Sequence, residues 1–237
     1  MEDMERYGDY TEYEEDIPKS KSKFVLTMKI LIAFVCISVL GVLAFRIVLF
    51  NTYPDSMKDI YFTDNLTAYY NVTDGDINAK TQMIRFPYDD EDKGNFFGAN
   101  LIVIEGAGEI QFSVRYNLST LETIEKQYGL KDLSPDDETL FSFKLVRPDP
   151  ESKSDPVETI VVSENPSYIE TDSRVMYRYF KLAFDGIDFE NPPAWLRVEI
   201  FVKGHEDEPF AMIPVYENNP DYAIFEEYDL GRKERPE

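Results

Sequence analysis

One apolar stretch, residues 24–50 (FVLTMKILIAFVCISVLGVLAFRIVLF), constrains this chain more than any other feature. Its central part from Ile30 to Phe45 contains no charged residue. As a helix that part extends about 24 Å, and the flanking apolar residues add the length needed to cross a bilayer core of about 30 Å. Lys29 and Arg46 would lie near opposite interfaces, where long side chains can reach the headgroups. The sequence therefore predicts one transmembrane helix over residues 24–50, with the lipid bilayer as its partner.

The basic residues near this stretch predict its orientation. Four lysines precede or begin it: Lys19, Lys21, Lys23 and Lys29. Beyond it only Lys58 is nearby, so the positive-inside rule places the N-terminus in the cytoplasm and residues from 51 onward outside. A cleavable signal peptide is the alternative, but its leading region would be long and acidic, and Ala44 is followed by Phe45 and Arg46 rather than by a small residue. We expect an uncleaved signal anchor in a single-pass protein of the cell membrane.

The charge and the cysteine content of residues 51–237 limit which partners this outer part can bind and how it is stabilised. The net charge is −22, and the first 50 residues hold eight acids and six bases, so residues 51–237 carry −20. Such a charge disfavours nucleic acid and anionic membrane surfaces as partners. The one cysteine, Cys36, lies in the apolar stretch, so the outer part has no disulfide and must rely on its apolar core. This favours a bacterial source, and we interpret the three N-x-S/T sequons, at Asn65, Asn71 and Asn117, as chance matches.

The chain divides into five segments by composition. Residues 1–23 are predicted to be a disordered acidic cytoplasmic tail, in which Tyr7, Tyr10 and Tyr13 are either phosphorylation or docking sites or part of a plain solvated tail. After the span, residues 51–76 form a juxtamembrane segment that is too apolar for a free linker and is expected to pack on the domain as an edge strand or a short helix. Residues 77–217 form an extracytoplasmic β domain, and residues 218–237 a loose C-terminal extension.

Alternating apolar residues indicate strands through the outer domain. In 109–116 (EIQFSVRY) the apolar side chains share one face and the polar ones the other, which is typical of a half-buried strand. A turn at 106–108 pairs it with 100–105 as a hairpin, and 195–203 with 210–216 form a second hairpin. Further strands are predicted at 139–147, 157–162 and 174–184, with a weaker one at 80–86. The fold class is mainly β, an antiparallel Ig-like β-sandwich with one short helix, preceded by the transmembrane α-helix.

The short helix is expected from Ser119 to Tyr128. Ser119 and Glu122 have the spacing of a capping box, with Ser119 as N-cap. Leu121, Ile124 and Tyr128 form one apolar stripe, and Gly129 is a suitable stop. A helix this short needs a sheet edge or a sandwich end to pack against.

Residues that could carry chemistry are few, and none is assigned a catalytic, cofactor-binding or metal-binding role. His205 is the single histidine and lies in an acidic turn. Acids gather at 89–92 and 74–76, where calcium is conceivable, but neither has the spacing of a calcium loop. Trp195, Tyr177 and Tyr179 fall on the polar faces of their strands, so they either form a surface for glycan or peptide or cover other parts of the domain. We expect no enzyme.

Several motifs of the outer domain resemble uncharacterised single-pass proteins of clostridial bacteria. The similar parts are residues 111–117 (QFSVRYN) followed by 119–122 (STLE), then 141–145 (FSFKL) and 179–188 (YFKLAFDGID). The resemblance implies an envelope protein of a Gram-positive bacterium with an extracytoplasmic β domain, and it implies no catalytic residues. The function expected from all this is a non-enzymatic binding or interaction module of the cell envelope, with a protein or cell-wall partner. The alternatives are a glycan-binding or calcium-binding surface domain and, less favoured, a cell-wall hydrolase.

Overall fold

The structure is a computed structural model that describes residues 19–82, 96–135, 137–154, 157–218 and 226–227. The chain forms two compact units, residues 1–52 and residues 53–237. The expected acidic cluster at 89–92 and the three tail tyrosines lie outside the described residues.

In the first unit the described residues form the helix α1 (Lys19–Asn51). It begins five residues before the predicted span and ends one residue after it. Within it, residues 23–49 are long and apolar enough to cross a membrane. Apolar residues lie on every side of this helix, so α1 lacks the one-sided apolar stripe of a helix that packs on a protein core.

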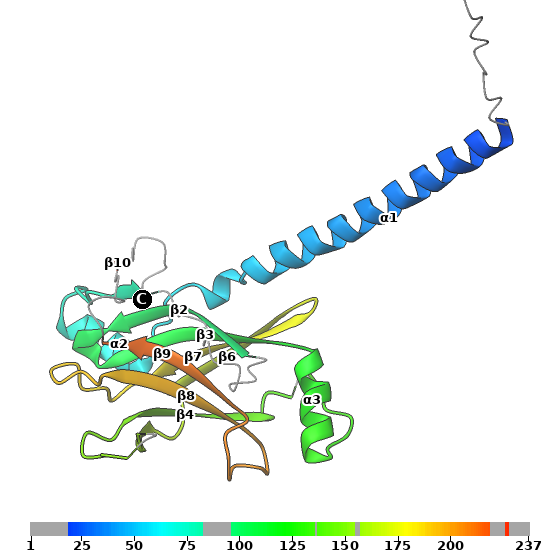
Figure 1. The fold of residues 1–237 in the computed structure, drawn as a ribbon. Coiled ribbons are helices and arrows are strands. Elements are labelled where there is room, and N and C mark those ends of the chain that lie inside the picture. Colours follow the sequence, from blue (N-terminus) through cyan, green and yellow to red (C-terminus); the bar gives the residue numbers. More distant parts are fainter. Residues whose placement is uncertain (1–18, 83–95, 136, 155–156, 219–225, 228–237) are drawn as a thin grey trace, which may run out of the picture. The chain divides into compact units, whose positions relative to one another are not determined.

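The second unit is mainly β, as predicted, and its strands form two antiparallel sheets (Figure 1). The larger sheet has the order β10-β1-β2-β3-β7-β6 and the smaller sheet the order β5-β4-β8-β9. The strand bounds are β1 (Lys80–Gln82), β2 (Phe96–Ile104), β3 (Glu109–Asn117), β4 (Phe141–Pro148), β5 (Thr159–Ser163), β6 (Tyr168–Arg174), β7 (Tyr177–Phe184), β8 (Trp195–Val202), β9 (Ala211–Glu217) and β10 (Glu226–Glu227).

The strand order is that of an Ig-like sandwich. If β2 to β9 are named A, B, C, C′, D, E, F and G in chain order, the two sheets read A-B-E-D and C′-C-F-G. Both predicted hairpins are present, because β2 pairs with β3 and β8 with β9. The C-terminal extension was expected to be loose, but two of its residues, Glu226 and Glu227, pair with β1 at the edge of the larger sheet.

The main core lies between the two sheets and consists of apolar side chains. Phe112 of β3 and Phe184 of β7 stack with ring centroids 6.0 Å apart, and Phe143 of β4 meets Phe180 of β7 edge to face at 5.1 Å. All four rings are buried. Cys36 is the chain's only cysteine, so this core lacks the inter-sheet disulfide of antibody domains and is held by apolar contacts.

A bulge in β2 changes which of its apolar residues face the core between the sheets and which face the opposite side of the larger sheet. The pairing register with β3 shifts between Ala99 and Ile102, and Asn100 at the shift has a positive φ of 53°. Before the bulge Phe96 faces the inter-sheet core, and after it Leu101 and Val103 do. Ile102, with Ile104, instead enters a second apolar cluster on the opposite side of the larger sheet. An extra residue in a strand of period two has this effect on every side chain that follows.

The second cluster joins the juxtamembrane segment to the sheet. This segment contains a 3₁₀ turn, η1 (Asp55–Met57), and a short helix, α2 (Asp64–Val72), so the expectation that it packs on the domain is confirmed in its helical form. Its apolar residues pack against β2, with these buried members: Ile60, Leu66, Ile77, Ala79, Ile102 and Ile104. Thr63 caps α2 by accepting a hydrogen bond from the Leu66 N–H at 3.0 Å.

The second short helix, α3 (Ser119–Tyr128), lies across one end of the sandwich (Figure 1). Leu121 and Ile124 are buried in the main core, and Gly129 ends the helix with a positive φ of 69°, as predicted. The predicted capping box is wrong. Leu118 is the N-cap and its apolar side chain has no atom that could accept a hydrogen bond, and the Oδ1 of Asn117 instead accepts from the Ser119 N–H at 3.1 Å.

Two strands, β6 and the two-residue β10, were not predicted, and one strand was predicted too long. The stretch 174–184 was expected to be a single strand, but it holds the end of β6, a turn and then β7. Val175 in that turn has a positive φ of 42°, which breaks the extended chain. Of the weaker strand expected at 80–86, residues 80–82 form β1 and the others lie outside the described residues.

Candidate functional site: the covered face of the larger sheet

The face of β3 that was expected to meet solvent is buried. Glu109, Gln111, Ser113 and Arg115 alternate with the core residues of this strand, and each is at most 1% exposed. Lys181 of the neighbouring strand β7 is buried beside them. The prediction of a half-buried strand is therefore wrong, because polarity shows which side chains share a face but not whether another segment covers that face.

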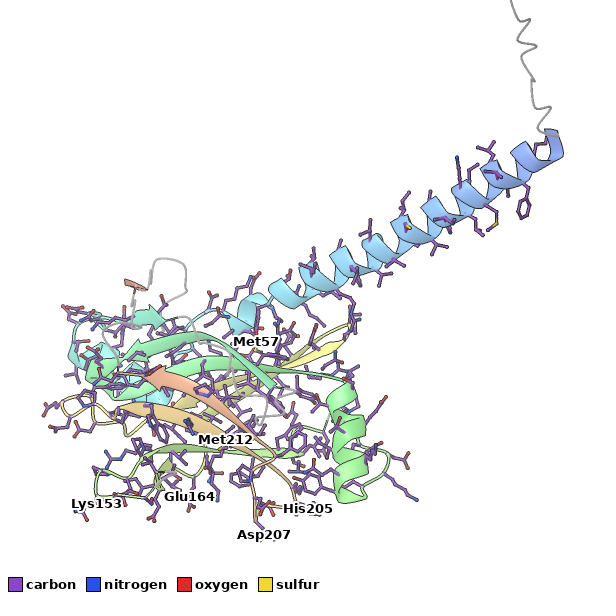
Figure 2. The ribbon with its side chains drawn as sticks, in the orientation of Figure 1. Met57, Lys153, Glu164, His205, Asp207 and Met212 are labelled. Carbon is purple, nitrogen blue, oxygen red and sulfur yellow. The ribbon has the colours of Figure 1, made fainter. Side chains whose placement is uncertain are left out.

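The covering segment is residues 53–63, here named the strap. It passes over β3 and β7, and Figure 2 labels Met57 where the strap meets the sheet. Ser113 Oγ donates a hydrogen bond to the carbonyl oxygen of Met57, and Lys181 Nζ donates to that of Asp59. Gln111 Nε2 donates to the carbonyl oxygen of Tyr61 at 2.6 Å. From Met57 to Tyr61, every second carbonyl of the strap is thus held by a side chain of the sheet.

Gln111 holds both sides of one strap residue. Its Oε1 accepts from the Tyr61 N–H at 2.7 Å while its Nε2 donates to the Tyr61 carbonyl. The same Nε2 donates to Glu109 Oε1 at 2.8 Å. The Gln111 amide thus pairs with both main-chain groups of one residue. Without it, the buried N–H and carbonyl of Tyr61 would lose these hydrogen bonds.

Glu109 closes the far end of this row. Its Oε2 accepts from Thr63 Oγ1 at 2.7 Å and from Asn65 Nδ2 at 2.9 Å. Burial raises the pKa of the Glu109 carboxyl, and the hydrogen bonds from Asn65, Gln111 and Thr63 oppose that rise. Asn65 also donates to the Ala107 carbonyl at 3.0 Å, so the amide of the first sequon is engaged inside the fold.

Arg115 forms the near end of the row, within a group of aromatic rings. Its guanidinium carbon lies 4.7 Å from the centroid of Tyr53, 5.2 Å from that of Tyr177 and 5.8 Å from that of Phe97. Tyr53 also meets Tyr179 edge to face at 5.3 Å. Burial raises the pKa of Tyr53 to about 12, although the charge of Arg115 acts in the other direction. Cation–π contacts of this kind strengthen when they are shielded from water.

The strap also contacts the edge strand β6. The rings of Tyr61 and Tyr168 stack with centroids 3.6 Å apart, and Ser56 Oγ donates to Asp172 Oδ2 at 3.0 Å. Burial, with the hydrogen bond to Glu170, raises the pKa of the Tyr168 hydroxyl. The strap therefore contacts all three strands β3, β7 and β6.

Sequence reasoning did not find this site, but one signal for it was available. Met57, Ile60 and Leu66 are more apolar than a connection to solvent requires, and each is completely buried. Apolar residues in such a segment need a surface to cover. Ile60 and Leu66 cover Ile102 and Ile104 of β2, and this packing holds the strap over the polar face of β3 next to it.

The aromatic residues considered for ligand binding do not form one surface. Tyr177 and Tyr179 belong to the Arg115 group on the larger sheet. Trp195 begins β8 in the smaller sheet and stacks under Arg197, whose guanidinium carbon is 4.4 Å from its ring centroid. Tyr179 is itself buried, so it covers part of the domain instead of presenting a platform.

The residues considered for metal or acid–base chemistry have structural surroundings. His205 lies in the β8–β9 turn, and its ring is 4.5 Å from that of Tyr128 on α3 (Figure 2). The acids at 74–76 lie in the turn after α2, where Asp74 and Gly75 have positive φ. Within the described part of the chain, no group of three or more His, Cys, Asp or Glu side chains is placed to hold a metal ion.

Among the described residues, two shallow hollows have volumes of about 260 and about 290 Å³. The first lies beside β6 and β7 and includes Asp137, Glu138 and Arg178. The second lies beside β5 and includes Arg147 and Asp188. Both are below the usual size of a pocket that encloses a small-molecule ligand.

Comparison with known protein families, with curated proteins and with solved structures finds no match to this chain.

Proposed function

We propose that this chain is a single-pass, membrane-anchored protein of the bacterial cell envelope. Its acidic Ig-like sandwich stands outside the membrane and binds a protein or cell-wall partner without catalysis. The helix α1 is the anchor, and the lysines before it favour a cytoplasmic N-terminus.

The main support for this proposal is the strap, because it leaves almost no free chain between the predicted span and the domain. Only Asn51 and Thr52 separate the predicted span from Tyr53, whose ring already packs against Arg115. From that residue the chain is held by the larger sheet through Thr63, without a free linker. A tether this short confines the domain and raises its effective concentration for partners at the same membrane.

The smaller sheet is the face we propose for the partner, since the strap already occupies the outer face of the larger one. Its outward residues mix charge with apolar surface. Arg197 is exposed and its guanidinium carbon lies 4.4 Å from the ring centroid of the partly exposed Trp195, and Val161 on the edge strand β5 is 49% exposed. Interfaces draw on such combinations of aromatic, cationic and aliphatic side chains.

The topology is tested by labelling cysteines in intact cells. In a Cys36→Ser background, a membrane-impermeant maleimide should label Val157→Cys in the sandwich, where the side chain is 47% exposed. It should label Thr11→Cys in the tail only after lysis. Labelling of Thr11→Cys alone in intact cells would reverse the orientation and overturn the proposal.

The partner is tested by photo-crosslinking in cells. A photoreactive amino acid at Val161 should yield adducts with a protein or a wall fragment, identified by mass spectrometry. The matched control is the same amino acid at Val72 on α2, which is 86% exposed but lies outside the proposed face. Equal adduct patterns from the two positions would contradict a specific face.

A further inference from the structure

We infer that the strap site on the larger sheet is an interaction surface for a second copy of this chain, in which two neighbouring copies exchange residues 53–72. In the exchanged pair, the strap of each copy lies on β3 and β7 of the other, and its α2 lies against β2 of the other. The inference rests on the proposed anchored function only in that both copies share one membrane.

The contacts that hold the strap do not depend on which copy supplies it. Ser113, Lys181 and Gln111 all bind main-chain carbonyls of the strap. Thr63 and Asn65 reach Glu109 through their side chains, and an incoming segment of the same sequence brings both residues. The surface therefore accepts the segment in trans with the same hydrogen bonds and the same buried apolar residues, Met57, Ile60 and Leu66.

The turn after α2 is the point where the exchanged segment would separate. Asp74, Gly75 and Asn78 have φ values of 54°, 91° and 39°, a conformation that only glycine adopts without cost. The chain needs this turn to bring β1 back to the sheet in the same copy. In an exchanged pair the turn opens into an extended connection, which relieves the two non-glycine residues. Short, strained hinges favour domain exchange for this reason.

Charge opposes any looser association of the two copies. Residues 51–237 carry −20, so two sandwiches that merely approach each other repel. Exchange of a buried segment supplies contacts strong enough to overcome this, and confinement of both copies in one bilayer raises their effective concentration.

The test is a disulfide between two differently tagged chains, each in the Cys36→Ser background and expressed together in the membrane. One chain carries Tyr61→Cys and the other Tyr168→Cys, because these two rings stack at 3.6 Å when the strap is in place. After mild oxidation, exchange should give a mixed product of twice the chain mass of 27.6 kDa, detected by both tags. The collision control pairs Tyr61→Cys with Val157→Cys, an exposed site on the segment leading to β5.

The remaining chains make every outcome decisive. A chain that carries both Tyr61→Cys and Tyr168→Cys is the positive control. It should form a disulfide either within one copy or between two copies, which shows that the domain is folded and that oxidation has worked. An internal disulfide in that chain, with no mixed product from the separate chains, would show that the strap stays within its own copy and overturn the inference. A mixed product no greater than that of the collision control would overturn it as well.

Two further variants separate exchange from other contacts. Ser56→Cys with Asp172→Cys should give the same mixed product, since these side chains are 3.0 Å apart across the same strap contact. Insertion of Gly-Ser after Asp76 lengthens the hinge and should reduce the mixed product of the Tyr61 pair to the level of the collision control. Maleimide labelling of Val157→Cys in the same membranes reports orientation independently, so a failure of the proposed topology is distinguishable from a failure of exchange.

Discussion

A single glutamine holds the strap where it crosses the larger sheet. Gln111 makes hydrogen bonds to the Tyr61 N–H, the Tyr61 carbonyl and the Glu109 carboxylate, and it is completely buried. Removing one member of such a group leaves the others without partners, and that is more costly than losing a hydrogen bond in water.

Gln111→Leu should therefore lower the free energy of unfolding by about 3 kcal/mol. The matched control is Gln127→Leu on α3, where the side chain is exposed and the change should stay within about 0.5 kcal/mol. Urea unfolding followed by the fluorescence of Trp195, the only tryptophan, measures both. Equal effects of the two substitutions would show that the strap contact contributes nothing to stability.

Glu109 makes the stability of the fold depend on pH. Its pKa is raised in the folded state because the carboxyl is buried, so the folded protein holds this proton more tightly than the unfolded chain does. Its contribution to folding stability is greatest below the unfolded pKa of about 4.3 and is lost as the pH rises through the folded pKa.

We expect the stability of the wild type relative to Glu109→Gln to fall as the pH rises through that window and to level off above it. Unfolding free energies measured at a series of pH values give this difference directly. Glu122→Gln, an exposed carboxylate of α3, serves as the control for loss of one charge. A relative stability that increases with pH would mean that hydrogen bonding, and not burial, dominates at Glu109.

At the scale of elements, two glycines allow a comparison of backbone cost with close packing. Gly108 lies just before β3 and Gly129 just after α3, and both have a positive φ but different surroundings. Gly129 at the end of α3 has a φ of 69° and open space where a Cβ would lie. Gly108 before β3 has a φ of 61°, and a Cβ there would lie 2.8 Å from the carbonyl oxygen of Ile187. Gly129→Ala should cost about 1 kcal/mol of stability through the backbone alone.

Gly108→Ala should cost a further 1 to 3 kcal/mol, on the order of an overpacked site, because that carbonyl belongs to the backbone and cannot rotate away. The difference between the two substitutions, taken from the same urea titrations, isolates the close approach. If both cost the same, the loop around Ile187 moves freely and the end of the sandwich is less tightly packed than it appears in the structure.

The sequence predicted the sheets well and the strap contact poorly, for one physical reason. Strict alternation in β3 and β8 identifies strands because side-chain direction has a period of two. It fails for β6 (YIETDSR), whose position at the edge of a sheet allows a mostly polar sequence. Alternation also cannot show that the polar residues from Glu109 to Arg115 are covered. The residues that cover them, 53–63, are far away in the sequence: the hydrogen bonds between the two segments join residues 46 to 56 positions apart.

At the scale of the whole molecule, net charge is the dominant electrostatic feature. The chain carries −22, and the ion pairs seen between described side chains, Lys58 with Asp55 and Lys80 with Glu105, are on the surface. Exposed pairs of this kind contribute little. Repulsion among the remaining carboxylates therefore outweighs attraction and opposes the compact state.

Salt should consequently stabilise this protein near neutral pH. Raising sodium chloride from about 0.01 to about 0.3 M shortens the screening length from roughly 30 Å to well under 10 Å, which weakens the repulsion among distant carboxylates, and the melting temperature of the detergent-solubilised full chain should rise. The same titration near pH 4.4, the isoelectric point of the sequence, should produce a much smaller shift, because little net charge then remains to be screened. This comparison separates screening from any general effect of salt on apolar burial, which persists at both pH values. A melting temperature that falls with salt at neutral pH would mean that specific attractive pairs hold the sandwich together, and that its acidity is balanced locally in spite of the large total charge.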